Sequence, residues 1–378
     1  MNINIINGAV NDQMKRIATI LFCLVAASSL YAQTIKNVSL LYPFFEKLVQ
    51  LEKSKKGKIN IVHIGDSHIQ PEFFTNAIRE PLQRQFGDGG RGFIFPYSVN
   101  KKVGGPYHYA TDSIWQICRN HQSFRCESGT EFGLSGYGFS TKAESFVFSV
   151  EAGENRYKFN TIKIVSPTAS SYSFAMDAGD NQLQEPFVSV YHQKKPISEI
   201  SFLPNKKQEL YSLNGLIVEK DGPGLIYHNI GVLGVMASDF NATPLFFEQL
   251  PVLLPDLVII SLGTNESFHD VTAEAFIEQI ELFIKNVRTF CKDVPVLVTS
   301  PPISLLNGGE FNTYILEYTN ALLQKENIAS WDLYSFTLTA KKIAGDNIHY
   351  TKGGYNDQGA AFAGDFFKEY KNYKRNRK

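Results

Sequence analysis

The sequence predicts an α/β protein with a parallel sheet, interrupted by a long segment that is entirely β. Short hydrophobic runs rich in β-branched residues alternate with amphipathic helical stretches before residue 96 and again after about residue 226. Several of these runs end abruptly in small polar residues. Between the two parts, apolar and polar residues alternate with a period of two. We therefore expect two α/β segments that share one sheet, with a β-sandwich inserted between them.

The first α/β segment contains the most informative turn of the chain. The hydrophobic run 59–64 ends in Gly-Asp-Ser, and an amphipathic helix is expected from about residue 72 to 86, while an earlier helix is expected at 40–51. A strand that stops at such a turn places it at the carboxyl edge of a parallel sheet, where open α/β folds bind ligands. Ser67 is therefore placed to act as a nucleophile.

The second α/β segment repeats this alternation. Apolar runs and amphipathic stretches predict strands at 257–262, 294–299 and 328–333, and helices at 273–287, 310–325 and 357–370. Alternating strands and helices imply a parallel sheet with right-handed crossovers. The basic end of the chain, 371–378, is expected to be a solvated tail.

The middle of the chain has a different pattern, with turn residues every eight to fourteen positions. Its period-two runs are 145–150, 161–165, 172–176, 187–191 and 216–218. Many short strands at this spacing favour a β-sandwich, and no helix is expected here. The segment is either an all-β module inserted into the α/β domain or an elaborate lid.

A candidate general base lies near the other end of the chain. Asp346 stands three residues before His349, in a loop ahead of a helix. A carboxylate at this spacing can accept a hydrogen bond from the Nδ1–H of the histidine. That bond fixes the tautomer and leaves Nε2 free to take a proton from a serine hydroxyl.

Two further segments are candidates for stabilising an oxyanion. Gly234 allows its backbone N–H to approach a substrate closely, and Asn265, just after the run 257–262, carries a strong neutral amide donor. Each motif alone is common in turns, but their joint order and their strand-end positions favour a real site. Asp66 is interpreted as a structural acceptor in the turn, and His68 as an orienting or packing residue.

These four blocks resemble the SGNH (or GDSL) hydrolases, over about residues 57–94 and 226–370. The matching positions are Ser67 in Gly-Asp-Ser-His, Gly234, Asn265 in Gly-Thr-Asn, and Asp346 with His349. The resemblance implies a flavodoxin-like three-layer α/β/α sandwich with an inserted all-β module, and a catalytic set without metal or cofactor. Ser67 would be the nucleophile, His349 the base and then the acid, and Asp346 its orienting group. The Ser67 and Gly234 N–H groups and the Asn265 side chain would hold the oxyanion.

Within that family, the Gly-Asp-Ser-His block and the long insertion look most like bacterial peptidoglycan O-acetylesterases. This resemblance implies an esterase that removes O-acetyl groups from peptidoglycan or another acetylated polysaccharide. The insertion would then resemble a carbohydrate-binding module that presents the polymer. Three alternatives remain open: a lipase, lysophospholipase or thioesterase of the same superfamily, a polysaccharide O-acetyltransferase, and a non-catalytic glycan-binding protein.

The N-terminal residues predict export. A basic Met-Lys-Arg at 14–16 precedes an apolar run at 17–30, which is typical of a secretory signal cleaved after Ala32 and too short to favour a membrane span. We expect a secreted or periplasmic protein without stable membrane insertion in its mature form. Basic and acidic residues both number 37, so nothing suggests a nucleic-acid partner.

The predicted domain order is a signal segment at 1–32, the hydrolase domain at 33–95 and 226–378, and the β module at 96–225. All proposed catalytic residues lie outside the module. Replacing it with a short linker is therefore expected to spare hydrolysis of a small ester, provided that the sandwich folds as its own unit. Cys118 and Cys126 either close a short loop or stay as buried thiols, and Cys291 is interpreted as an inert core residue.

Overall fold

The computed structural model describes residues 35–101, 105–121, 126–168, 172–175, 182–339 and 342–377. The predicted signal segment lies outside these residues. No helix among the described residues is both long and apolar enough to cross a membrane.

The central sheet is parallel and has the strand order β14-β1-β15-β16-β17. These strands are β1 (Lys58–Gly65), β14 (Gly224–Gly231), β15 (Leu257–Ser261), β16 (Val296–Thr299) and β17 (Ala329–Trp331). Numbered along the chain, this order is 2-1-3-4-5, the flavodoxin-like arrangement, in which ligands bind where the strand order reverses, beyond the carboxyl end of the first strand. The predicted fold class is confirmed.

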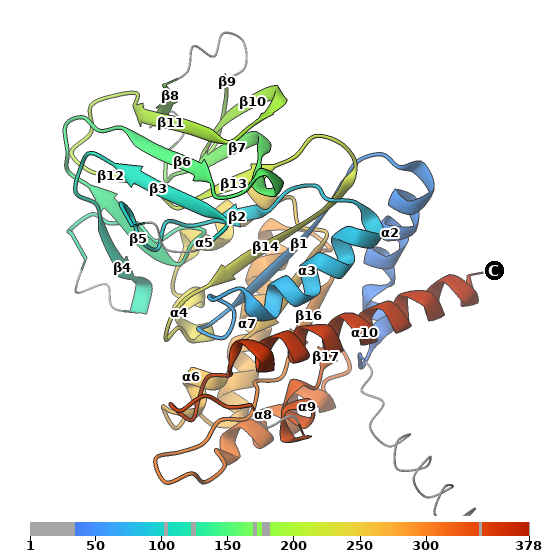
Figure 1. Ribbon diagram of the computed structural model, residues 1–378. Helices are drawn as coiled ribbons and strands as arrows, with labels where there is room; N and C mark the ends of the chain where they lie inside the picture. The colour runs from blue at the N-terminus through green and yellow to red at the C-terminus, as the bar shows by residue number, and fades with distance from the viewer. Residues whose placement is uncertain are drawn as a thin grey trace, which may run out of the picture. The chain divides into compact units, whose positions relative to one another are not determined.

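Helices cover both faces of this sheet because alternate residues of each strand are buried against different layers. Ile61 packs in one hydrophobic cluster and its neighbour Val62 in another. The first layer contains α2 (Tyr42–Ser54), α3 (Phe73–Phe86) and α10 (Lys352–Asn376), and the second contains α4 (Ala237–Asn241), α5 (Pro244–Gln249), α7 (Ala273–Phe290) and α8 (Thr313–Gln324). Figure 1 shows α3 and α10 side by side in the first layer. Short helical segments complete the layers: η1 (Val38–Leu41), η5 (Leu250–Leu253), α6 (Thr264–Ser267) and α9 (Leu333–Thr339).

The middle of the chain forms three antiparallel sheets, as its period-two pattern predicts (Figure 1). Their orders are β2-β13-β7-β10-β9, β3-β6-β11-β8 and β12-β5-β4. The strands are β2 (Gly92–Ile94), β3 (Tyr107–Thr111), β4 (Gln116–Arg119), β5 (Tyr137–Thr141), β6 (Phe148–Ala152), β7 (Phe159–Val165), β8 (Tyr172–Phe174), β9 (Gln182–Glu185), β10 (Val188–Ile197), β11 (Glu199–Pro204), β12 (Tyr211–Ser212) and β13 (Gly215–Glu219). The 3₁₀ turn η3 (Asn155–Tyr157) interrupts the β pattern. Cys118 and Cys126 form a disulfide.

The antiparallel sheets and the α/β layers share one hydrophobic core. Val62 and Ile260 of the central sheet belong to the same buried cluster as Ile164 and Leu216 of the antiparallel part. Polar contacts cross the same boundary. Gln249 of α5 is fully buried; its Oε1 accepts the Leu134 N–H at 2.8 Å, and its Nε2 donates to the Ser166 carbonyl at 3.1 Å.

Candidate active site

The predicted functional residues converge at the carboxyl edge of the central sheet. Ser67 follows β1, Gly234 follows β14, and Asn265 follows β15. Asp346 and His349 lie in the loop before α10. Parallel strands bring these distant segments to the same edge because all their carboxyl ends point in one direction.

Ser67, His349 and Asp346 form a hydrogen-bonded chain. His349 Nε2 lies 2.8 Å from Ser67 Oγ, and Asp346 Oδ2 accepts the bond from His349 Nδ1 at 2.7 Å. The Ser67 residue is 8% exposed, whereas the His349 side chain is 35% exposed. The serine hydroxyl is therefore recessed, and the imidazole forms part of an open rim. This geometry is the one required of a nucleophile, a base and an orienting carboxylate.

The loop that carries His349 is held by its own backbone bonds. Asp346 Oδ1 accepts the N–H groups of Ile348 at 3.0 Å and of His349 at 2.9 Å. Asn347 adopts a φ of 65°, a left-handed conformation that asparagine tolerates better than most residues. Its carbonyl accepts the N–H of Leu305 at 2.8 Å. The hydrogen bonds of this turn therefore fix the positions of both Asp346 carboxylate oxygens in the absence of substrate.

Asp346 is stabilised as a carboxylate. Partial burial by itself would raise its pKa, but the hydrogen bonds from the His349 ring and from the His349 and Ile348 N–H groups outweigh it and hold the pKa at about 2. The carboxylate therefore stays charged over the working pH range. A permanent charge beside Nδ1 keeps the proton on that nitrogen and leaves Nε2 as the base.

Three hydrogen-bond donors are candidates for the oxyanion site: the N–H groups of Ser67 and Gly234 and the side chain of Asn265. Gly234 has a φ of 76°, a conformation that glycine adopts without steric cost. Among the described residues, the N–H groups of Ser67 and Gly234 have no protein acceptor. Asn265 Nδ2 donates one hydrogen to the Val235 carbonyl at 2.9 Å, which leaves its second hydrogen available. The arrangement can stabilise a developing oxyanion.

Behind this site lie two buried carboxyls, Asp66 and Glu266. Burial raises the pKa of each to about 7. Asp66 Oδ1 accepts the His68 N–H at 2.9 Å, the turn role that the sequence suggests. Glu266 Oε1 accepts the Ala237 N–H at 2.8 Å and so fixes the segment after Gly234. The sequence reasoning missed Glu266, although an acidic residue directly after Asn265 was a visible signal.

Two further histidines, His68 and His63, make hydrogen bonds and ring contacts that stabilise the fold. His68 Nδ1 lies 2.9 Å from the Tyr355 hydroxyl, and its ring packs 5.2 Å from that of His349. His63 lies between the hydroxyls of Tyr227 and Ser261, at 2.7 Å from each. Burial lowers the pKa of both imidazoles to about 3, so they are neutral. Within the described part of the chain, no cluster of three or more His, Cys, Asp or Glu residues is arranged to hold a metal ion.

The antiparallel sheets also reach the site, which the sequence does not reveal. The Tyr137 hydroxyl of β5 accepts the Leu233 N–H at 3.1 Å, and Arg119 Nη1 of β4 donates to the Leu233 carbonyl at 3.4 Å. A side chain added at Gly234 would lie 3.2 Å from His121 Nε2. No motif marks these three residues, because their role depends on the tertiary contact alone.

The flavodoxin-like sheet with this constellation at its edge defines an α/β hydrolytic enzyme. The model of the GDSL-like lipase/acylhydrolase family matches residues 61–362. The chain belongs to that family, and it is a carboxylic ester hydrolase.

One of the solved structures similar to the chain supports the fold assignment. A peptidoglycan O-acetylesterase structure is 18% identical, covers 87% of this chain and 96% of its own, and superposes with a TM-score of 0.69. A lipase/acylhydrolase from Enterococcus faecalis is 21% identical over 38% of this chain and 75% of its own, with a TM-score of 0.33. A carbohydrate esterase family 3 enzyme from Talaromyces cellulolyticus is 16% identical over 39% of this chain and 72% of its own, with a TM-score of 0.31. No curated protein sequence matches the chain.

Proposed function

We propose that the protein is an exported serine esterase that removes O-acetyl groups from a polysaccharide, with peptidoglycan as the first candidate. The observation that carries the catalytic part is the 2.8 Å approach of His349 Nε2 to Ser67 Oγ, with Asp346 behind the imidazole. The likeness to a peptidoglycan O-acetylesterase, which extends over the α/β part and the antiparallel sheets, supports the choice of substrate. The apolar run at 17–30 supports export.

The reaction proceeds by two acyl transfers. Ser67 Oγ attacks the ester carbonyl carbon while its proton passes to His349 Nε2. The resulting imidazolium, stabilised by the Asp346 carboxylate, returns that proton to the leaving sugar oxygen, and the C–O bond to the sugar breaks. Water then attacks the acetyl-serine with His349 as the base, and acetate leaves as the proton returns to Ser67 Oγ.

The negative charge of each tetrahedral intermediate falls on the former carbonyl oxygen. In this proposal, the N–H groups of Ser67 and Gly234 and the second amide hydrogen of Asn265 donate to that oxygen. Because these donors are fixed before the substrate binds, they stabilise the transition state without a cost of reorganisation. The recessed Ser67 hydroxyl favours a short acyl group such as acetyl.

Acetate release tests the proposal. The purified protein should release acetate from O-acetylated peptidoglycan, and Ser67→Ala should abolish release while keeping the wild-type melting temperature. A serine-directed phosphonate should label the wild type at Ser67. Nitrophenyl esters of increasing length provide the comparison, because an acetylesterase prefers the acetyl ester. Preference for a long acyl chain, or labelling at another serine, would refute the assignment.

A further inference from the structure

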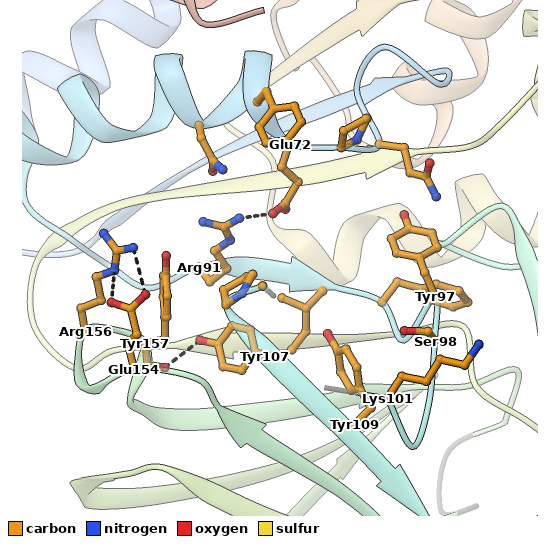
Figure 2. A pocket seen from close by; sticks show the side chains of 18 residues that line it. Glu72, Arg91, Tyr97, Ser98, Lys101, Tyr107, Tyr109, Glu154, Arg156 and Tyr157 are labelled. Atoms are coloured by element: carbon orange, nitrogen blue, oxygen red, sulfur yellow. Dashed lines mark hydrogen bonds and ion pairs between the residues drawn. The ribbon is translucent and has the colours of Figure 1, made fainter. Parts of the chain in front are cut away.

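A cavity of about 490 Å³ lies between the segment that leads into α3 and the antiparallel sheets. Residues 70–76, just beyond the Ser67 turn, form one wall, and residues from β2, β3 and η3 form the other. Figure 2 shows Glu72 on one side of this space and a group of tyrosines on the other. Neither Ser67 nor His349 lines the cavity, so the ester chemistry does not account for it.

Aromatic rings form much of the antiparallel wall: Tyr97, Tyr107, Tyr109 and Tyr157 line the cavity (Figure 2). Two of them are fixed by hydrogen bonds. The Tyr107 hydroxyl donates to the Tyr157 carbonyl at 2.8 Å, and the Tyr97 hydroxyl donates to the Gly231 carbonyl at 3.0 Å. Rings that are already immobile present flat apolar faces to a ligand at little entropic cost.

Charged groups lie among these rings and are themselves held in place. Arg91 pairs with Glu72, and its guanidinium carbon lies 5.8 Å from the centre of the Tyr157 ring. The Arg91 side chain is 8% exposed, and its Nε has no hydrogen-bond partner among the described residues. Arg156, at the rim, pairs with Glu154 and lies 4.7 Å from the centre of the Tyr157 ring. The cavity therefore combines apolar faces with fixed donors and acceptors.

This combination fits a sugar ring. A pyranose presents C–H groups on its faces and hydroxyls around its edge, so it stacks on aromatic rings while its edge bonds to charged side chains. An acyl chain would remove water from the Arg91–Glu72 ion pair without offering a hydrogen-bond partner in its place, at a cost. We infer that this cavity is a saccharide subsite that binds a sugar unit of the polymer away from the acetyl ester. The inference rests on the proposed function for its choice of polymer.

A second hollow lies beside the cavity, and its lining includes Leu233, the residue before Gly234. This hollow, about 320 Å³, is lined by Leu233 and Arg119 among other residues, and it shares Gln70 and Tyr97 with the cavity. Leu233 precedes the proposed oxyanion donor Gly234, and Gln70 lies three residues after Ser67. A glycan chain can therefore occupy the subsite while a neighbouring unit presents its acetyl group to Ser67. Binding energy from the remote unit then positions the reacting ester.

Two variants test the subsite. Tyr157→Ala removes the ring that stacks beside Arg91, and Arg156→Ala removes a rim side chain that is 62% exposed and costs the fold little. Arg288→Ala, at an exposed position on α7 outside the cavity, is the matched control. For each variant, shown to be folded by its melting temperature, kcat/KM is measured on O-acetylated peptidoglycan and on 4-nitrophenyl acetate. The polymer-to-aryl ratio should fall about tenfold for Tyr157→Ala and a few-fold for Arg156→Ala, through KM. Arg288→Ala should keep the wild-type ratio.

Calorimetric binding of the disaccharide N-acetylglucosaminyl-N-acetylmuramic acid separates this inference from the proposed function. The wild type should bind the disaccharide, and Tyr157→Ala should bind it about tenfold more weakly. A wild type that binds the disaccharide but releases no acetate from peptidoglycan would refute the function and leave the subsite standing. Folded Tyr157→Ala and Arg156→Ala proteins that keep the wild-type ratio and affinity, or a wild type that does not bind the disaccharide, would overturn the subsite.

Discussion

At the scale of single residues, Asn265 shows how one side chain serves structure and chemistry at once. One amide hydrogen bonds the Val235 carbonyl at 2.9 Å and so orients the group, and the other is left available for the proposed oxyanion. Removing one oxyanion donor typically costs roughly 10²–10³ in turnover, or about 3–4 kcal/mol. Asn265→Ala should therefore lower kcat by that factor with little change in KM. Asn241→Ala is the control, because that amide bonds the Gln279 carbonyl away from the site. A rise in KM at constant kcat would instead assign Asn265 to ground-state binding.

The buried Glu266 predicts a specific dependence of stability on pH. Burial raises its pKa from 4.5 to about 7, so the folded state binds more protons than the unfolded state between these values. The free energy of unfolding therefore falls as pH rises from about 4.5 to 7 and is level above that. Buried His68, with its pKa lowered to about 3, acts in the opposite direction between pH 3 and 6.5. The pH dependence of the wild-type stability therefore contains both effects.

Glu266→Gln isolates the carboxyl, because an amide keeps an acceptor for the Ala237 N–H and does not ionise in this range. The melting temperature of the wild type, minus that of the variant, should fall by a few degrees between pH 5 and 8. Glu278→Gln, at an exposed position on α7, is the matched control. A constant difference for Glu266→Gln would mean that Glu266 is ionised in the folded protein.

At the scale of elements, the sequence predicts helices and strands best where buried residues recur with a regular period. The strand at 59–64 and the helix at 72–86 correspond closely to β1 and α3. The last helix was predicted too short, since α10 begins at Lys352, before Gly353 and Gly354, two residues of low helix propensity. Thr351 compensates by accepting the Gly354 N–H with its side chain.

Two other differences from the predictions have separate causes. The end predicted as a solvated tail is largely exposed but helical to Asn376, and Lys374 pairs with Glu52 of α2 at 2.6 Å. The short helices α4, α5 and α9 have five to seven residues, too few for a helical period to appear in the sequence. The strand ends that carry Ser67 and Asn265 could be predicted, because an apolar run that stops at polar residues is a local feature of the sequence.

The contacts of Tyr137 join segments far apart in the chain, so no local sequence pattern indicates them.

The turn after β14 depends on an element from the antiparallel sheets. The Leu233 N–H bonds the Tyr137 hydroxyl of β5 at 3.1 Å, and Gly234 follows directly. Tyr137→Phe removes the acceptor of that partly buried N–H, which costs at most about 1–3 kcal/mol and allows the turn to move. We expect kcat on a small acetyl ester to fall about three- to tenfold, with KM nearly unchanged. Tyr172→Phe loses a comparable buried bond, to the Ser212 carbonyl, and should lower the melting temperature without this loss of kcat. Equal kcat in both variants would remove the role given to Tyr137.

At the scale of the whole molecule, the shared core determines what the antiparallel sheets contribute. The sequence alone favours a module that can be removed without loss of chemistry, because the proposed catalytic residues lie outside it. The contacts favour the opposite outcome. Central-sheet residues such as Ile260 and antiparallel residues such as Ile164 lie in one buried cluster. Gln249, Tyr97 and Tyr137 add polar contacts across the same boundary.

Replacing residues 96–213 with a short linker tests these two outcomes. Removal would expose one side of the shared core, and every 100 Å² of apolar surface left exposed costs about 2.5 kcal/mol. It would also free the turn at Leu233 and Gly234 from Tyr137. We therefore expect the shortened protein to be unfolded, or folded with kcat/KM on 4-nitrophenyl acetate lowered at least about tenfold. Circular dichroism and thermal melting establish the fold, and Ser67→Ala gives the background rate. A folded, shortened protein with wild-type kcat/KM on the aryl ester would show that the module only presents the polymer, since the oxyanion turn would then hold its shape without β5.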